Sequence, residues 1–346
     1  MKTLMEKEIC EQAAVLPGIL QKNAPVFESM AKALRERRIP FIVIAARGTS
    51  DNAAVYGKYA IEANTGIPVA LAAPSVSTVY NKPYRTENAL VIGISQSGEA
   101  ADVLSVMADG NRNGAMTVAV TNNPGSALAA AAAFHLDCGV GPELSVAATK
   151  TFTAALLLLA KLTSLLALDD NFDRQMAGFA GDMEKCVGLR DKIFRLARQH
   201  ARMDTCLTLS RGYDYCIALE SALKMQECAK VRSLAFSLAD FMHGPISLVE
   251  ENLPCLLLCK KGAFENEYKA LLDKLLGLRA NLIVITDDTG LQELTPDVIV
   301  VPKPACEALS PIYFACAAQL FACGLALAKG LDPDRPRNLQ KVTVTR

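Results

Sequence analysis

The sequence carries no excess of either charge. Lys+Arg and Asp+Glu each number 36 in 346 residues, so the formal net charge is zero. A chain of this kind has no broad electrostatic surface for nucleic acid or for an anionic membrane. Any binding of phosphate groups must therefore depend on the local structure of a site.

The eleven cysteines lack the spacings of a zinc site or a disulfide scaffold. No C-x-x-C pair occurs, Cys255 and Cys259 enclose three leucines, and Cys316 and Cys323 lie among apolar residues. Small apolar thiols of this kind are typical of a protein core in a reducing compartment. We therefore expect a cytoplasmic protein without a metal centre.

The sequence also lacks a signal peptide and a long uninterrupted apolar run. Charged residues occur throughout 1–16, and Lys161 interrupts the most apolar stretch, 151–168. The uninterrupted part is too short to cross a bilayer. We interpret 151–168 as a buried helix of a globular protein.

What the sequence does contain is an alternation of short apolar runs with helix-length segments. The runs predict strands at 41–46, 69–72, 89–94, 116–120 and 134–137, and again at 206–210, 234–238, 254–259, 281–286 and 298–302. This alternation predicts an α/β fold with two five-stranded parallel sheets, each covered by helices on both faces. The first strand of each half runs into Arg-Gly, at Arg47–Gly48 and Arg211–Gly212, which indicates an internal duplication.

The length of the chain suits two domains. We expect an N-terminal helical segment at 1–40, a first α/β domain at 41–168, a helical linker at 169–202, a second α/β domain at 203–331 and a tail at 332–346. Prolines in the tail prevent a regular helix there.

Two loops of the first half have the composition of an anion site. They are G-T-S at 48–50 and S-Q-S-G-E at 95–99, each between a predicted strand and a predicted helix. Such turns leave backbone N–H groups free at the positive end of a helix, at the sheet edge where ligands bind. The alternative is that Ser50 and Ser97 only cap helices. Neither loop is a Walker or dinucleotide-binding motif.

A second candidate cluster lies in A-L-E-S-A-L-K-M-Q-E-C, residues 218–228. Glu220, Lys224 and Glu227 are spaced to share one face of a helix, where each perturbs the protonation of the others. The same spacing also suits a solvated face with ion pairs. His243 precedes Gly-Pro, and that position suits either a catalytic imidazole or a turn residue.

The motifs together resemble the sugar isomerase (SIS) domain family in tandem form. Within it, they are similar to the isomerase half of glutamine–fructose-6-phosphate transaminase and to stand-alone glucosamine-6-phosphate deaminases. The matching segments span nearly the whole chain in the order of the family. They are R-G-T-S-D-N (47–52), G-I-S-Q-S-G-E-A-A-D (93–102), A-A-T-K-T-F-T (147–153), S-R-G-Y-D (210–214), A-L-E-S-A-L-K-M-Q-E (218–227), H-G-P-I-S-L-V (243–249) and R-N-L-Q-K-V-T-V (337–344).

The resemblance implies a flavodoxin-like fold for each half and a phosphosugar ligand. It implies that substrate and phosphate contact Gly48, Thr49, Ser50, Ser95, Gln96, Ser97, Val146, Ala147 and Glu220. Glu227 matches the base that moves a proton between C1 and C2, with Lys224 beside it. His243 matches the histidine that opens the sugar ring, which a neighbouring subunit lends, so a homodimer is expected. Lys341 matches a tail lysine that reaches the sugar carbonyl.

Two positions depart from the synthase pattern. Ala100 stands where the synthase has Thr, and Ala148 stands where it has Ser, so the polar lining is reduced. The glutaminase domain of the synthase is also absent before residue 41, which favours hydrolysis of an aminosugar phosphate over synthesis.

We therefore expect a glucosamine-6-phosphate deaminase that needs no metal or organic cofactor. Two alternatives stay open. One is an isomerase or deaminase of another aminosugar phosphate, such as galactosamine 6-phosphate or a fructosamine 6-phosphate. The other is a regulator that binds phosphosugars without chemistry, although such a protein typically lacks the base or the histidine.

Overall fold

Two five-stranded parallel sheets form the framework of the computed structural model, which describes residues 2–341. The first sheet consists of β1 Ile42–Ala45, β2 Val69–Leu71, β3 Leu90–Ile94, β4 Met116–Thr121 and β5 Phe134–Asp137. The second consists of β6 Thr205–Ser210, β7 Arg232–Ser237, β8 Pro254–Cys259, β9 Asn281–Thr286 and β10 Val298–Val300. The predicted α/β class is confirmed.

Both sheets have the same topology. The first has the order β2-β1-β3-β4-β5, and the second has β10-β9-β8-β6-β7, with parallel pairs throughout. Numbered from its own first strand, each sheet therefore reads 2-1-3-4-5, which is the flavodoxin-like order. This shared order supports the internal duplication that the two Arg-Gly turns predict.

The chain forms two units, and it passes between them more than once. One unit contains residues 2–13, 144–149 and 178–339 and holds the second sheet; the other contains 14–143, 150–177 and 340–341 and holds the first sheet. Each unit is described separately below. We call them the second-sheet unit and the first-sheet unit.

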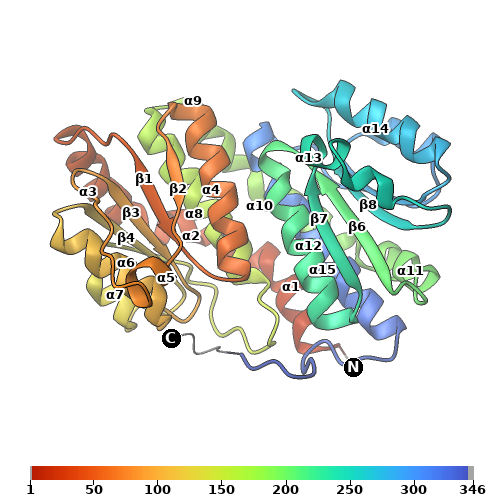
Figure 1. The fold of residues 1–346 in the computed structure, drawn as a ribbon, viewed down its shortest axis with the longest axis horizontal. Coiled ribbons are helices and arrows are strands. Elements are labelled where there is room, and N and C mark those ends of the chain that lie inside the picture. Colours follow the sequence, from red (N-terminus) through yellow and green to blue (C-terminus); the bar gives the residue numbers. More distant parts are fainter. Residues whose placement is uncertain (1, 342–346) are drawn as a thin grey trace. The chain divides into compact units, whose positions relative to one another are not determined.

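Helices cover both faces of each sheet (Figure 1). Those used below are α1 Leu4–Val15, α3 Ala24–Arg35, α4 Thr49–Thr65, α6 Ala101–Arg112, α7 Ala127–Ala131, α8 Lys150–Ala167, α9 Asp170–Gln175, α12 Tyr215–Ala229, α13 Leu238–Met242, α14 Glu265–Gly277 and α15 Ser310–Ala328. The remaining helices are α2 Ile19–Lys22, α5 Ser75–Thr78, α10 Phe179–Gly188 and α11 Arg190–Gln199, with short 3-10 turns between elements. In the first-sheet unit, α4 and α8 pack together on one face, and α6 and α7 lie on the other.

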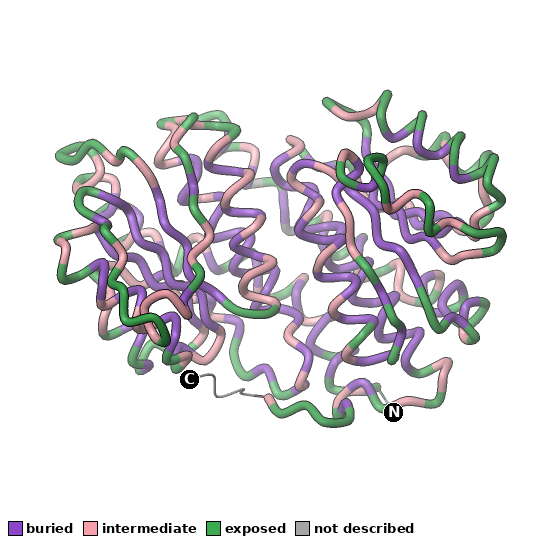
Figure 2. The backbone as a smooth tube through the Cα atoms, in the orientation of Figure 1, coloured by how far each residue is buried: buried purple, intermediate pink, exposed green. Residues whose placement is uncertain are grey.

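The central strands are almost fully buried, as Figure 2 shows for both sheets. Two helical segments, Lys150–Ala167 and Glu307–Ala328, are long and apolar enough to cross a membrane by composition. However, 78% and 89% of these segments are buried inside the structure, so they are core helices here. The interpretation of 151–168 as a buried helix is confirmed.

Candidate functional site

The two predicted anion loops leave the first sheet side by side. Strands β1 and β3 are paired in parallel, with Ala45 opposite Gly93, so the loops that follow them start at the same sheet edge. The guanidinium of Arg47, in the first loop, pairs with the buried carboxylate of Asp102, in the first turn of α6 after the second loop. This ion pair joins the two loops.

The N-cap positions of α4 and α6 supply no side-chain cap. They are Gly48 and Ala100, and neither side chain accepts a hydrogen bond from its helix. The alternative that Ser50 and Ser97 cap these helices is therefore wrong. Local groups accept some of the first N–H groups: the Gly48 carbonyl accepts from Asp51, and the Asp102 side chain accepts from Val103. Each loop still leads into the positive end of a helix, which favours an anion.

The serine hydroxyls of the second loop hold the shape of that loop. The Ser95 hydroxyl accepts the N–H of Gly98 at 3.1 Å, and the Ser97 hydroxyl accepts the N–H of Glu99 at 3.3 Å. Each hydroxyl can still donate its own hydrogen to a ligand oxygen. Gln96 and Ser97 are half-buried, whereas Ser95 is almost fully buried.

Helix α12, in the second-sheet unit, brings Glu220, Lys224 and Glu227 together. The Lys224 ammonium lies 3.4 Å from the Glu220 carboxylate and donates a hydrogen bond to Glu227. The Lys224 and Glu220 side chains are both 1% exposed, whereas the Glu227 side chain is 22% exposed. A solvated helix face is therefore ruled out for this trio, and only Glu227 faces open space.

The electrostatics of this trio keep Lys224 charged. Burial alone would lower the pKa of the Lys224 ammonium, but the nearby carboxylates of Glu220 and Glu227 outweigh burial and raise it above its ordinary value. A partly exposed carboxylate that accepts a hydrogen bond from an ammonium is suited to act as a base.

His243 follows α13 and is exposed in the single chain. Its imidazole makes no hydrogen bond or ion pair within residues 2–341. Three apolar side chains close to it in sequence are also exposed: Leu234 by 52%, Met242 by 43% and Leu248 by 48%. The structure does not bring His243 into contact with Glu227.

Lys341, in the first-sheet unit, is held by a carboxylate that sequence reasoning missed. Its ammonium lies 3.2 Å from the Glu143 carboxylate. The Glu143 side chain is fully buried and also accepts the N–H and hydroxyl of Thr151 at 3.1 and 2.8 Å. The sequence offered one indication that Glu143 belongs to the site: it lies just before the motif at 147–153.

Val146 and Ala147 belong to a segment that lies within the second-sheet unit. Glu8 of α1 accepts backbone N–H groups of this segment, and the Gln319 amide of α15 donates to the Thr149 carbonyl at 3.1 Å. Val146 is half-buried and Ala147 is buried.

The predicted residues divide into two sets, one on each unit. Gly48, Thr49, Ser50, Ser95, Gln96, Ser97 and Lys341 lie on the first-sheet unit, and Val146, Ala147, Glu220, Lys224, Glu227 and His243 on the other.

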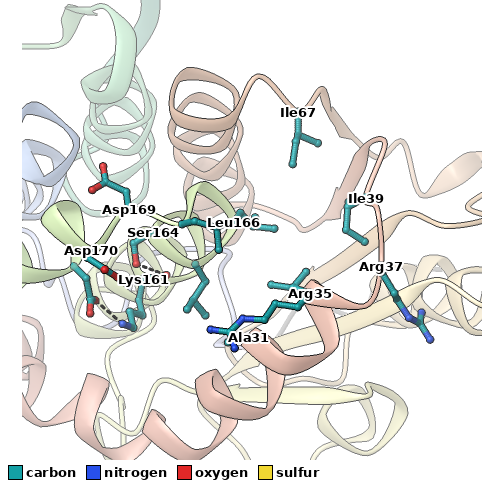
Figure 3. Close-up of a pocket in the computed structure, with 14 residues that line it drawn as sticks. Ala31, Arg35, Arg37, Ile39, Ile67, Lys161, Ser164, Leu166, Asp169 and Asp170 are labelled. Atoms are coloured by element: carbon teal, nitrogen blue, oxygen red, sulfur yellow. Dashed lines mark hydrogen bonds and ion pairs between the residues drawn. The ribbon is translucent and has the colours of Figure 1, made fainter.

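A cavity of about 430 Å³ in the first-sheet unit lies away from the predicted residues (Figure 3). It is lined by α3, α8 and α9, with Arg35, Lys161 and Asp170 among its charged groups. Ile39 and Ile67 also line it and precede β1 and β2, so the cavity lies at the amino ends of the strands. The anion loops follow the carboxyl ends, at the opposite edge of the sheet.

Metal and thiol chemistry find no support in the part of the chain that the structure describes. No group of three or more His, Cys, Asp or Glu side chains there is arranged to hold a metal ion. None of the eleven cysteines forms a disulfide, and nine of them are buried. Burial raises the pKa of the thiols of Cys228, Cys255, Cys259 and Cys323 to about 12, which makes them poor nucleophiles.

Comparison with known proteins agrees with this geometry. A glutamine–fructose-6-phosphate aminotransferase (isomerizing) from Aquifex aeolicus (strain VF5) is 33% identical over 99% of this chain, which spans only 58% of that relative. The C-terminal domain of glucosamine-fructose-6-phosphate aminotransferase from Francisella tularensis superposes with a TM-score of 0.85 at 25% identity, covering 97% of this chain and 99% of that one. A glucosamine-6-phosphate deaminase from Thermotoga maritima shares the fold, with a TM-score of 0.74 and 23% identity over 99% of this chain and 100% of that one. The family model of the SIS domain matches residues 37–165 and again 201–329, so the chain belongs to the SIS domain family, with the domain present twice.

Proposed function

We propose that this protein is an aldose–ketose isomerase of aminosugar phosphates, and specifically that it deaminates glucosamine 6-phosphate to fructose 6-phosphate and ammonia. The observation that carries the proposal is the buried trio on α12. Lys224 is held as an ammonium between two carboxylates, and only Glu227 is exposed enough to meet a substrate. The family match and the two paired anion loops, each leading into the start of a helix, support a phosphosugar as the ligand.

The proposed reaction needs only proton transfers and one water molecule. The phosphate binds the loops at 48–50 and 95–97, and His243 moves the proton that opens the pyranose ring. Glu227 removes the C2 proton of the open-chain aldehyde and returns it to C1, while O1 gains a proton and the C2 nitrogen loses one. The C1 carbonyl becomes an alcohol and the C2 amine becomes an imine. Water then hydrolyses the imine, which releases ammonia and leaves the C2 ketone.

Two lysines have electrostatic roles in this scheme. Lys224 holds the Glu227 carboxylate by a hydrogen bond and stabilises negative charge that develops on the substrate oxygen. Lys341 is an ammonium paired with Glu143, so it is suited to polarise the sugar carbonyl. A Schiff base between Lys341 and the sugar would first require this ammonium to lose its proton.

We further propose that the active protein is a homodimer in which each chain lends His243 to its partner. The exposed imidazole and the exposed apolar side chains of Leu234, Met242 and Leu248 support a subunit contact at this surface. Eleven cysteines without a disulfide among them support a reducing compartment, the cytoplasm.

The test is an ammonia assay with glucosamine 6-phosphate, repeated with galactosamine 6-phosphate and a fructosamine 6-phosphate. Glu227→Gln should bind the substrate and lose about 10²- to 10⁴-fold in kcat. Glu267→Gln, an exposed carboxylate on α14, is the matched control and should keep wild-type activity. Ammonia from another aminosugar alone would reassign the substrate, and binding without ammonia from any of them would indicate a regulator.

A further inference from the structure

The second sheet has loops at the topological positions that form the anion site of the first. Strand β8 is the third strand of its repeat, as β3 is in the first, and residues 260–264 lead from it into α14. Strand β6 runs into Arg211–Gly212 as β1 runs into Arg47–Gly48. This edge of a parallel sheet is where ligands bind. In the second repeat, however, side chains of the protein itself occupy it.

The carboxylate of Glu307 fills the loop before α14. Its Oε1 accepts the N–H of Ala263 at 2.9 Å. A Cβ atom at Gly262 would lie only 2.1 Å from the same oxygen, and Gly262 has a φ of +139°. The loop therefore needs glycine at this point and wraps closely around the carboxylate. An oxyanion held by a backbone N–H at the start of a helix is the arrangement of a bound anion.

The lysine of this loop is held by groups of the protein itself. The Lys260 ammonium forms an ion pair with Asp214 at 2.8 Å and donates to the Ser310 hydroxyl at 2.7 Å and the Glu307 carbonyl at 3.0 Å. The Lys260 and Asp214 side chains are 3% and 0% exposed. The ammonium is therefore paired and almost completely buried, which makes it a poor ligand for an external anion.

The loop after β6 is covered by an aromatic ring. A Cβ at Gly212 would lie 2.6 Å from the Phe264 ring, and the Arg211 guanidinium lies 4.7 Å from the centre of that ring. In the first repeat, apart from its chain neighbours, no atom of residues 2–341 lies within 4 Å of a Cβ at Gly48. The corresponding space is thus open in one repeat and filled in the other.

We propose that Glu307 is a built-in anion that occupies the ligand site of the second repeat, so that each chain can bind an external phosphate only through its first repeat. The position that the Glu307 carboxylate occupies, against Gly262 and the N–H of Ala263, is suited to a small oxyanion, either a carboxylate or a phosphate. This inference goes beyond the proposed function, because it concerns the repeat that carries no predicted phosphate contact.

Glu307→Ala in the full-length protein tests the proposal by chemical rescue. The variant leaves the Ala263 N–H without its acceptor, so its Tm should fall by roughly 3 °C or more. Rising formate at constant ionic strength, with chloride as the balancing salt, should restore the loss, because formate can occupy the vacated position. Inorganic phosphate should act similarly. Wild type and Glu267→Ala should show neither the loss nor the formate response.

A Tm of Glu307→Ala that equals wild type, or a formate response equal in all three proteins, would overturn the proposal. If Glu307→Ala does not fold, Glu307→Gln provides the test, since the amide oxygen can still accept from Ala263 but carries no charge. Its Tm should fall by a smaller amount and be insensitive to formate; an unchanged Tm would contradict the role of the carboxylate charge. None of these readouts involves sugar turnover, so their failure is distinct from failure of the proposed function.

Discussion

The ammonium of Lys224 lies 3.4 Å from the carboxylate of Glu220, and both side chains are 1% exposed. Solvent cannot screen either charge at this depth, so each depends on the other. Glu227 completes the trio from the next turn of α12 and is the member that remains accessible. The buried pair of Lys224 and Glu220 therefore positions the carboxylate of Glu227, to which Lys224 donates a hydrogen bond.

Glu220→Ala should destabilise the protein by about 3–5 kcal/mol, since it leaves a buried ammonium with a single carboxylate partner. Urea unfolding at pH 7 measures this change. Glu265→Ala removes an exposed i,i+4 partner of Lys269 and should change stability little; an equal effect of both variants would contradict the prediction.

The trio should also make stability depend on pH in strong alkali. The pKa of Lys224 is raised in the folded chain, so the stabilisation that this group provides is complete below about pH 10.4. It is lost as the pH rises through the folded pKa.

Buried thiols should make the protein less stable in alkali. Burial raises the pKa values of Cys255 and Cys259 to about 12, whereas a thiol in the unfolded chain titrates near about 8.5. Above pH 8.5 the unfolded chain therefore releases protons that the folded chain keeps. The free energy of unfolding should fall by up to about 1.4 kcal/mol per pH unit for each such thiol.

Urea midpoints measured between pH 7.5 and 9.5 test this slope, under reducing conditions. The double variant Cys255→Ala, Cys259→Ala should have a lower stability at pH 7.5 but a shallower slope. Parallel slopes in the variant and wild type would show that other groups cause the pH dependence.

The fold was predictable because its signal is local. Ten apolar runs of strand length alternate with helix-length segments, and the structure has a strand at each of the ten. Differences are confined to the ends: the run at 234–238 belongs to a strand that begins at Arg232, where pairing with β6 extends it. A continuous apolar run of strand length indicates burial on both faces of a sheet, and this signal is read from neighbouring residues alone.

The site was only partly predictable because its chemistry depends on burial and long-range contacts. The spacing of Glu220, Lys224 and Glu227 is the same on a solvated and on a buried helix, and only packing removes Lys224 from water. Glu143 and Lys341 are far apart in the sequence, so nothing local indicates their ion pair. Ser50 and Ser97 suited N-caps by residue type, but the helices begin at positions where Gly48 and Ala100 hold the cap.

Ala100→Thr should strengthen both α6 and phosphate binding. Ala100 is an N-cap residue in extended conformation without a side-chain acceptor, and a hydroxyl there can cap the helix, for about 0.5–2 kcal/mol. The same hydroxyl adds a donor beside the proposed phosphate, so KM should fall with little change in kcat. Unfolding and steady-state kinetics measure the two effects.

Asp169→Ala is the matched control for the cap. Asp169 caps α9 by accepting the N–H groups of Asn171 and Phe172, so its loss should lower stability by about 1 kcal/mol without changing KM. If Ala100→Thr left KM unchanged or raised it, the prediction that the added hydroxyl donates to a bound phosphate would be contradicted.

Subunit complementation should decide whether His243 acts across a subunit contact. His243→Ala and Glu227→Gln should each be nearly inactive as pure proteins, since each lacks one group that moves a proton. In a mixed dimer, the chain with intact Glu227 meets the partner that carries the intact imidazole, so one of the two sites is complete. Random mixing of equal amounts should then restore about a quarter of wild-type activity. Mixing through a dissociation step followed by the ammonia assay measures this. If His243 instead served its own chain, every chain in the mixture would lack one group, and activity would stay at the level of the single variants.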